Sequence, residues 1–241
     1  MRSGVHRCRH RRVVNPPRSV DSITQRAVQV FIDVENASKS FGPLIVLKDF
    51  SCTIASGRVT ALVGPSGSGK STLLAAMAGF QRLDSGTIRY RHPNGTTDLP
   101  NAQRIAWVPQ GANSLGARSA LDNVLLSALA SGRDLTSARE IAHAQLQKVG
   151  LGDKAHVLAR HLSGGELQRV GFARALAAEK PIIFADEPTS SLDAANTFQI
   201  AELLLSLREI ASIVVATHDP ILVEAAQDVV QVRREHGAVS A

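Results

Sequence analysis

Cysteine is scarce in this 241-residue sequence, which contains only Cys8 and Cys52. Cys52 lies in an alternating apolar stretch without a nearby partner, so we expect a buried thiol in a reducing compartment and no disulfide. Cys8 stands between His6 and His10, but one short cluster near a chain end does not make a fixed tetrahedral metal site. We therefore expect neither a disulfide framework nor a metal at this cluster.

Long apolar runs are also absent from the sequence. No stretch approaches the length of about 18 residues that a membrane-spanning helix needs. The first residues also lack the apolar core of a secretory signal. If this protein works at a membrane, we expect another chain to span it. The length suits one α/β domain with a modest insertion.

Excess charge is confined to one end of the chain. Residues 1–26 hold seven Arg and one Asp and account for the whole net charge of +6, whereas the other 20 basic and 20 acidic residues cancel. A groove that follows a nucleic-acid backbone needs basic residues gathered on the folded surface, so we expect no nucleic-acid partner. Residues 1–27 are predicted to form a basic disordered tail. A transit peptide, a contact with an anionic surface or an over-long start remain alternatives for it.

From residue 28 onward the hydrophobic pattern becomes regular. It predicts strands over 28–34, 47–54 and 59–63, then a helix over 70–80. Segments 86–92 and 104–110 flank Pro93-Asn94-Gly95, which predicts a β excursion with a hairpin-like turn. Residues 120 to about 148 predict amphipathic helices with no strand between them, inside a helical insertion at about 111–178.

Strand signals return at 181–186 and 211–217, separated by a helical run over 194–209. Strands that alternate with helices predict a parallel sheet covered on both faces. In such a sheet the ligand lies at the carboxyl ends of the strands. Residues that follow these strands are therefore the candidates for a functional site.

A phosphate-binding loop follows the strand predicted over 59–63. It satisfies G-x-x-x-x-G-K-[ST], so that backbone N–H groups and the next helix start form an anion site. Lys70 would reach the β- and γ-phosphates, and the Ser71 hydroxyl would bind Mg²⁺. A Rossmann site is excluded because Lys-Ser-Thr stands where its third glycine is needed. The loop comprises Gly64, Pro65, Ser66, Gly67, Ser68, Gly69, Lys70, Ser71 and Thr72.

Two adjacent carboxylates end the apolar run over 181–186. A carboxylate committed to Mg²⁺ is a poor base, whereas one free of the metal can orient or deprotonate a water. We assign Asp186 to the metal and Glu187 to the attacking water. Without the phosphate-binding loop, the pair could equally be solvated surface acids.

A second small-residue cluster, Leu162-Ser163-Gly164-Gly165-Glu166, precedes a predicted helix. It provides a second anion-binding helix start, which is useful only if it faces phosphate from the opposite side. The stretch "LSGGELQRV" resembles the signature motif of the ATP-binding cassette (ABC) ATPases. Further marks of this family follow the same order: Phe41 resembles the aromatic A-loop residue, Gln110 the Q-loop, Asp193 in "SSLD" the D-loop, and His218 the switch histidine.

The resemblance covers about residues 28–235 and implies the rest of the site. It implies that Phe41 stacks on adenine, that Gln110 touches Mg²⁺ and that His218 contacts the γ-phosphate, with Lys70, Glu187 and His218 as the catalytic groups. It further implies a head-to-tail dimer in which Ser163, Gly164, Gly165 and Glu166 of one copy close over the other's nucleotide. The segment "THDPILVEAAQDVVQVR" is similar to lipoprotein and macrolide exporter ATPases, whereas "TSSLD" differs from their usual "TGNLD".

These observations lead to one expected architecture and function. We expect an α/β P-loop NTPase with a mostly parallel core sheet, an N-terminal antiparallel β subdomain and a helical subdomain that carries the signature motif. It would bind ATP and Mg²⁺, pair with a second copy or a homologous subunit, and power a separate transmembrane permease from the cytoplasmic face of the membrane. The alternative is a non-transport ABC ATPase in a soluble assembly or cell-division complex.

Overall fold

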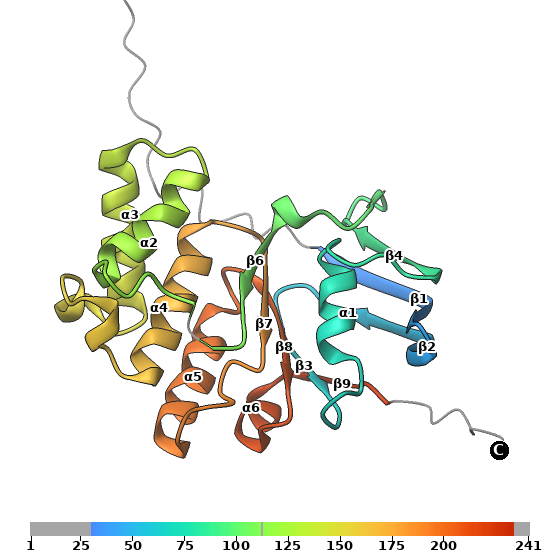
Figure 1. The fold of residues 1–241 in the computed structure, drawn as a ribbon. Helices are drawn as coiled ribbons and strands as arrows, with labels where there is room; N and C mark the ends of the chain where they lie inside the picture. The colour runs from blue at the N-terminus through green and yellow to red at the C-terminus, as the bar shows by residue number, and fades with distance from the viewer. Residues whose placement is uncertain (1–29, 112, 234–241) are drawn as a thin grey trace, which may run out of the picture.

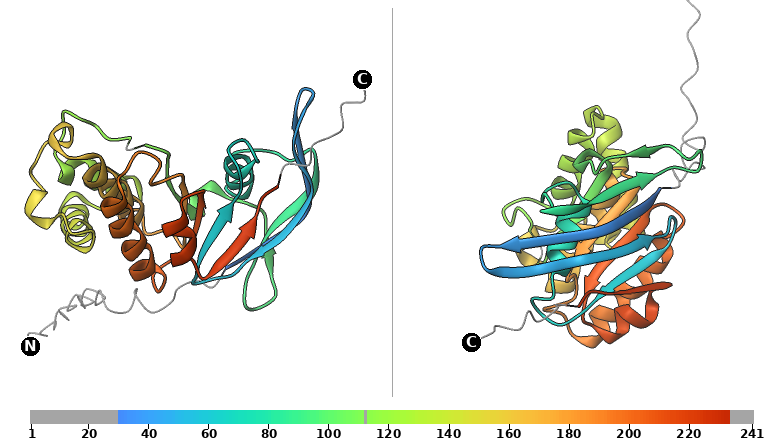
Figure 2. Two further views of the ribbon diagram at one scale, coloured as in Figure 1. Left: turned by 90° about the horizontal axis from the view of Figure 1, so that it is seen from below. Right: turned by 90° about the vertical axis from the view of Figure 1, so that its right-hand side faces the viewer.

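The computed structural model describes residues 30–111 and 113–233, and they contain two β-sheets and a group of helices (Figure 1). The predicted basic tail, with Cys8 and the first two residues of the strand predicted at 28–34, lies outside the described residues. Figure 2 shows the sheets at one end of the molecule and the helices of the predicted insertion at the other.

The antiparallel sheet has the strand order β2-β1-β4-β5. Its strands are β1 (Phe31–Phe41), β2 (Leu44–Ile54), β4 (Ser85–Arg91) and the short β5 (Thr97–Asp98). β1 and β2 form a hairpin that turns at Gly42, where φ is 58° and glycine meets no steric penalty. Ile32 and Val34 of β1 point into the core while Asp33 faces outward, which is the alternation expected of a sheet covered on one side.

The second sheet has the order β6-β7-β8-β3-β9, and every adjacent pair is parallel. Because its strands all run the same way, the residues that follow β3, β7 and β8 meet at one edge. This edge positions the candidate site. The strands are β3 (Val59–Val63), β6 (Ile105–Val108), β7 (Ile182–Asp186), β8 (Ser212–Thr217) and β9 (Asp228–Gln231).

Alternate residues of the central strands contribute to two separate hydrophobic cores. Phe184 of β7 belongs to the core shared with α1 (Lys70–Met77) and the antiparallel sheet. The neighbouring Ile183 and Ala185 belong to the other core, which includes α5 (Ala194–Leu207) and Leu222 of α6 (Pro220–Ala225). The parallel sheet is therefore buried on both faces, which explains its nearly continuous apolar strands.

The helical insertion is built from α2 (Ala120–Ala130), α3 (Leu135–Lys148) and α4 (Gly164–Ala177), joined by the short 3₁₀ turns η3 (Gly152–Lys154) and η4 (Ala159–His161). Ser119 and Ser163 cap α2 and α4 through reciprocal capping boxes, and Asp134 caps α3. A side-chain cap therefore satisfies the start of each of these helices.

Three features of the fold differ from the sequence predictions. The segment over 104–110 does not belong to the β excursion: a 3₁₀ turn, η2 (Ala102–Arg104), leads into β6, which pairs with β7 at the edge of the parallel sheet. The hairpin around 93–95 instead closes with β5, where His92 N–H donates to the Thr96 carbonyl. Neither α6 nor β9 was predicted, because both segments are short.

The structure also describes the surroundings of Cys52 and the length of each helix. Cys52 is free and only partly exposed, and burial raises the pKa of its thiol to about 12. Within the two described ranges, no helix combines the length and the apolar character required to cross a bilayer.

Candidate nucleotide-binding site

A cavity of about 370 Å³ opens where the loop after β3 meets the β1–β2 hairpin. Residues far apart in the sequence meet there because β3, β7 and β8 end at the same edge of the sheet. Eleven of its thirteen lining residues are predicted site residues, and the other two are apolar. The lining consists of Phe41, Leu44, Val46, Ser66, Gly67, Ser68, Gly69, Lys70, Ser71, Thr72, Gln110, Glu187 and His218.

The loop from Gly64 to Gly69 leaves no room for a side chain at its first and last positions. A Cβ on Gly64 would lie 2.2 Å from the Val232 carbonyl, and one on Gly69 would lie 2.9 Å from the Val46 carbonyl. Gly69 also has φ of 99° and caps α1 without a side-chain hydrogen bond. The first N–H groups of α1 are therefore free of a side-chain cap and can bind an anion.

Lys70 is almost completely buried at the start of α1, with 6% of its surface exposed. Its ammonium donates to the carbonyls of Gly64 at 2.9 Å and Pro65 at 3.3 Å and lies 3.2 Å from Glu187 Oε1. A buried ammonium needs such partners because an isolated charge is costly away from water. Phosphate oxygens could replace these partners without leaving the charge unsatisfied.

Ser71 and Asp186 form the candidate metal site. Ser71 Oγ donates to Asp186 Oδ1 at 2.9 Å, although the two residues are 115 positions apart. Burial raises the pKa of Asp186, while the bond from Ser71 acts in the opposite direction and the nearby Glu187 charge adds to the rise. Across the described residues, no group of three or more His, Cys, Asp or Glu side chains could hold a metal. A hydroxyl beside one carboxylate suits Mg²⁺, which takes few protein oxygens and completes its shell with phosphate and water.

Glu187 follows β7 with a strained backbone. Its φ is 44°, unusual for a residue with a side chain, and its N–H donates to the Ala216 carbonyl of β8 at 2.8 Å. This conformation places the carboxylate between Lys70 and His218, whose Nδ1 lies 2.9 Å from Oε2. The side chain of Glu187 is 14% exposed and that of His218 is 67% exposed.

Two predicted residues lie on the walls of the cavity. Phe41, at the end of β1, is 47% exposed, and Lys39 Nζ lies over its ring, 5.3 Å from the centroid. Gln110 follows β6, and its amide nitrogen donates a long 3.5 Å hydrogen bond to Ser190 Oγ. That bond connects the loop after β6 to the segment after Glu187.

The predicted signature residues do not line the cavity of their own chain. Ser163 caps α4, accepting from the Glu166 N–H at 3.3 Å, while the Glu166 carboxylate accepts from Ser163 N–H at 2.9 Å. Asp193 caps α5 and accepts from the N–H and side-chain amide of Asn196. The structure therefore separates these residues from the phosphate-binding loop of the same molecule.

Sequence reasoning missed three residues at this site. Leu44 and Val46 form an apolar wall beside Phe41, and Ser190 holds Gln110. Leu44 and Val46 lie just before the predicted strand over 47–54, so extending that strand back to the Gly42 turn would have found them. Ser190 begins the "SSLD" stretch, but its contact with Gln110 was not predicted, because that contact depends on tertiary packing.

P-loop NTPases are defined by a glycine loop between a parallel strand and a helix, a buried lysine, and a serine at the helix start paired with an aspartate at the end of a neighbouring strand. The predicted fold class is thus confirmed, with its parallel sheet, its antiparallel sheet and its helices.

Comparison with known proteins identifies the family. Residues 47–190 match the ABC transporter family. The chain is 37% identical over 194 residues to the arginine transport ATP-binding protein ArtM of Bacillus subtilis, covering 78% of this chain and 81% of that protein. It is equally 37% identical over 198 residues to the lipoprotein-releasing system ATP-binding protein LolD of Aquifex aeolicus, covering 79% and 88%.

A solved structure agrees with these relatives. The dimeric structure of MJ0796, a bacterial ABC transporter cassette, superposes with a TM-score of 0.71 at 30% identity and covers 83% of this chain and 94% of that one. The chain belongs to the ABC transporter family, as an ATP-binding subunit of the ABC ATPase type.

Proposed function

We propose that this chain hydrolyses ATP with Glu187 as the general base. Its carboxylate is held at the mouth of the cavity by contacts to Lys70 and His218. Lys70 would exchange its present partners for the β- and γ-phosphates, and the exposed His218 would contact the γ-phosphate. Glu187 would take a proton from the attacking water as the oxygen bonds to the γ-phosphorus and the bond to the bridging oxygen breaks.

The Ser71–Asp186 pair is the proposed Mg²⁺ site, with Gln110 as an additional contact. The 2.9 Å bond between hydroxyl and carboxylate brings together two oxygens that would bind the ion. Mg²⁺ bound there would neutralise charge on the phosphates. Gln110 also lines the cavity and would exchange its long bond to Ser190 for the metal.

Phe41 is proposed to stack on adenine. Its exposed ring lines the cavity together with Leu44, Val46 and the phosphate-binding loop. An apolar wall with an exposed aromatic ring suits a base, whereas the loop suits the phosphates.

We further propose that two copies bind head to tail, with the start of α4 from each closing over the other's phosphate-binding loop. Ser163 Oγ accepts from Glu166 N–H, and its own O–H would donate to a phosphate of the partner's nucleotide. Gly164 and Gly165 add the N–H groups of a helix start. Asp193 lies near this surface and would contact the partner. The related cassette MJ0796 is itself dimeric.

The position of Glu187 between Lys70 and His218 carries the proposal of ATP hydrolysis. Mixing two inactive variants tests the head-to-tail pairing. Lys70→Ala removes the phosphate-binding lysine, and Ser163→Arg blocks the start of α4. A head-to-tail dimer of one copy of each has one intact composite site, so the mixture should hydrolyse ATP faster than either variant alone.

A trap experiment serves as the control. With Glu187→Gln added to both chains, the mixed pair should retain one ATP per dimer on sedimentation, while neither variant dimerises alone. A mixture as inactive as its components, with no ATP retained, would contradict pairing in trans.

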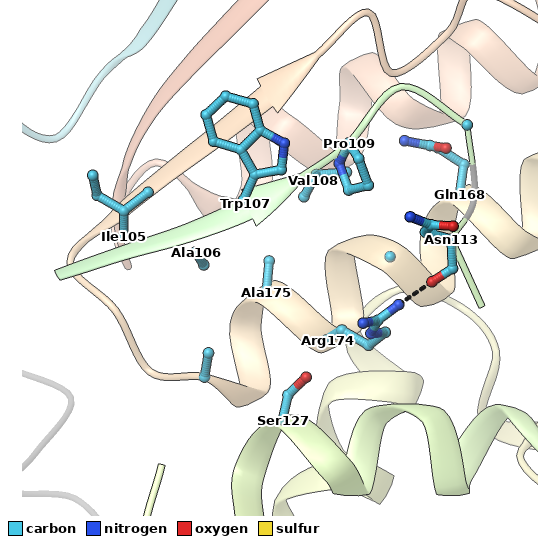
Figure 3. A pocket seen from close by; sticks show the side chains of 13 residues that line it. Ile105, Ala106, Trp107, Val108, Pro109, Asn113, Ser127, Gln168, Arg174 and Ala175 are labelled. Atoms are coloured by element: carbon cyan, nitrogen blue, oxygen red, sulfur yellow. Dashed lines mark hydrogen bonds between the residues drawn. The ribbon is translucent and has the colours of Figure 1, made fainter. Parts of the chain in front are cut away.

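A second cavity, of about 410 Å³, is the proposed docking site for a helix of a separate membrane subunit (Figure 3). It lies between β6 and the helices α2 and α4, with Trp107, Pro109, Ser127 and Ala175 among its walls. Trp107 makes an edge contact with Phe80, which is 62% exposed. Pro109 precedes Gln110, which connects this groove to the nucleotide site. Such docking would place the chain peripherally on the cytoplasmic face of the membrane.

A pull-down from membranes tests the docking proposal. The wild-type chain should recover a multi-span membrane protein, and Ser127→Trp, which fills the groove, should not. Leu126→Trp changes the neighbouring residue of α2, which is 50% exposed and does not line the groove, and should recover the same protein. Equal recovery by the two variants would place the partner elsewhere.

A further inference from the structure

Lys154 and Glu166 form an ion pair beside the start of α4. Lys154 ends η3, and its ammonium contacts Glu166 Oε1 while Oε2 accepts from the N–H of Ser163. The bond from Lys154 is the main cause of the lowered pKa of Glu166, followed by the bond from Ser163. Both oxygens of an ionised carboxylate are thus engaged within the turn that is proposed to bind phosphate.

This carboxylate creates an electrostatic problem. A negative charge in the first turn satisfies the helix dipole, but the same turn is proposed to receive the polyanionic nucleotide of a partner. A glutamine would cap Ser163 equally well through its carbonyl oxygen and would carry no charge. The glutamate therefore needs a nearby cation if the start of α4 is to attract phosphate.

The local structure fixes Lys154 where this cation is needed. Leu151 and Ala155, on either side of the η3 turn, are each only 1% exposed, and the Ala155 carbonyl accepts from Leu121 N–H at 2.8 Å. The side chain of Glu166 is 16% exposed, so its charge is only partly screened by water. Lys154 is 42% exposed and reaches the carboxylate from the solvent side.

We propose that Lys154 is a positioning residue for the second copy of this chain. It neutralises Glu166 and holds the carboxylate against Ser163, which leaves the hydroxyl and the N–H groups of α4 receptive to the partner's nucleotide. This inference rests on the proposed head-to-tail dimer, and it adds a residue that touches neither nucleotide nor metal.

A double-mutant cycle in the Glu187→Gln background tests the proposal. The dissociation constant of the ATP-bound dimer is measured by analytical ultracentrifugation. Lys154→Met should weaken dimerisation about tenfold, which corresponds to about 1.4 kcal/mol, and Lys154→Arg should restore it. With Glu166→Gln present, Lys154→Met should have little further effect, because no charge remains to be neutralised.

Two controls separate this role from simple support of the fold. Lys148→Met removes the same charge from the exposed end of α3 and should leave the dimer unchanged. ATP affinity of the monomer should be equal for all variants, since Lys154 does not line the cavity of its own chain. The role of Lys154 would be overturned, with the proposed dimer intact, if Lys154→Met weakened dimerisation equally in the presence of Glu166→Gln. It would also be overturned if Lys154→Met did not weaken dimerisation at all. A parent chain that fails to dimerise with ATP would overturn the proposed dimer with it.

Discussion

Glu187 Oε2 lies 2.9 Å from His218 Nδ1, and this contact joins the residues that follow β7 and β8. It exists because the two strands are parallel neighbours that end together and because φ of Glu187 is 44°. The strained backbone turns the carboxylate back toward the phosphate-binding loop. Strain of this kind is found where geometry serves a function.

Glu187→Gln should retain ATP binding and lose turnover by about 10²- to 10⁴-fold, the usual contribution of a positioned base. The amide keeps the length and the contact to His218 but cannot accept a proton. Steady-state hydrolysis and equilibrium ATP binding measure the two effects. Glu202→Gln, on the exposed face of α5, is the matched control and should hydrolyse normally. Hydrolysis by Glu187→Gln within a few-fold of wild type would reject the assignment.

Phe41→Ala should weaken ATP binding by about 1 to 3 kcal/mol if the ring stacks on adenine as aromatic side chains stack on other bases. Titration with a fluorescent ATP analogue measures the loss. Phe198→Ala removes another exposed ring, which belongs to α5 and does not line the cavity, and should leave affinity unchanged. If Phe41→Ala bound ATP with unaltered affinity, the ring would contribute only to the β1–β2 hairpin and not to nucleotide binding.

Asp186→Asn should abolish hydrolysis yet stabilise the nucleotide-free protein near neutral pH. Burial raises the pKa of Asp186, so the folded state favours the protonated form. The stabilisation that this provides is present below the pKa of the unfolded chain and is lost as pH rises through the higher folded value. Asparagine does not ionise, so it avoids this loss of stability, and its side-chain oxygen still accepts from the Ser71 hydroxyl. The advantage in Tm of the variant over wild type should therefore grow from acid to neutral pH, and a pH-independent difference would contradict this account.

Gly165→Ala should destabilise the fold, whereas Gly164→Ala should not. A Cβ on Gly165 would lie 2.2 Å from Asn196 Oδ1 and 3.1 Å from its Cβ, and moving that side chain breaks its bond to Asp193. Overpacking of this kind costs about 1 to 3 kcal/mol. A Cβ on Gly164 meets only Leu192, at an ordinary 3.6 Å. Thermal unfolding of both variants checks the contrast, and equal Tm values would refute it.

The candidate site was largely predictable because its residues are contiguous or follow recognisable strands. The loop from Gly64 to Thr72 is a single motif, and Asp186 and Glu187 end one apolar run. The prediction that segment 104–110 belongs to the β excursion was wrong, because a four-residue apolar strand such as β6 has the same hydrophobic pattern in either sheet. Leu44 and Val46 were missed because the predicted strand began after them.

By itself, the amino-acid sequence determined the phosphate-binding loop, the carboxylates at the end of β7, the capped start of α4 and the alternation of strands and helices. Each of these depends on residues that are near one another in the chain. Only the tertiary structure decided that Ser71 reaches Asp186, that Glu187 lies between Lys70 and His218, and that Lys154 pairs with Glu166. These contacts depend on which strands and turns pack side by side, and that choice is made by burial of apolar surface across the whole chain.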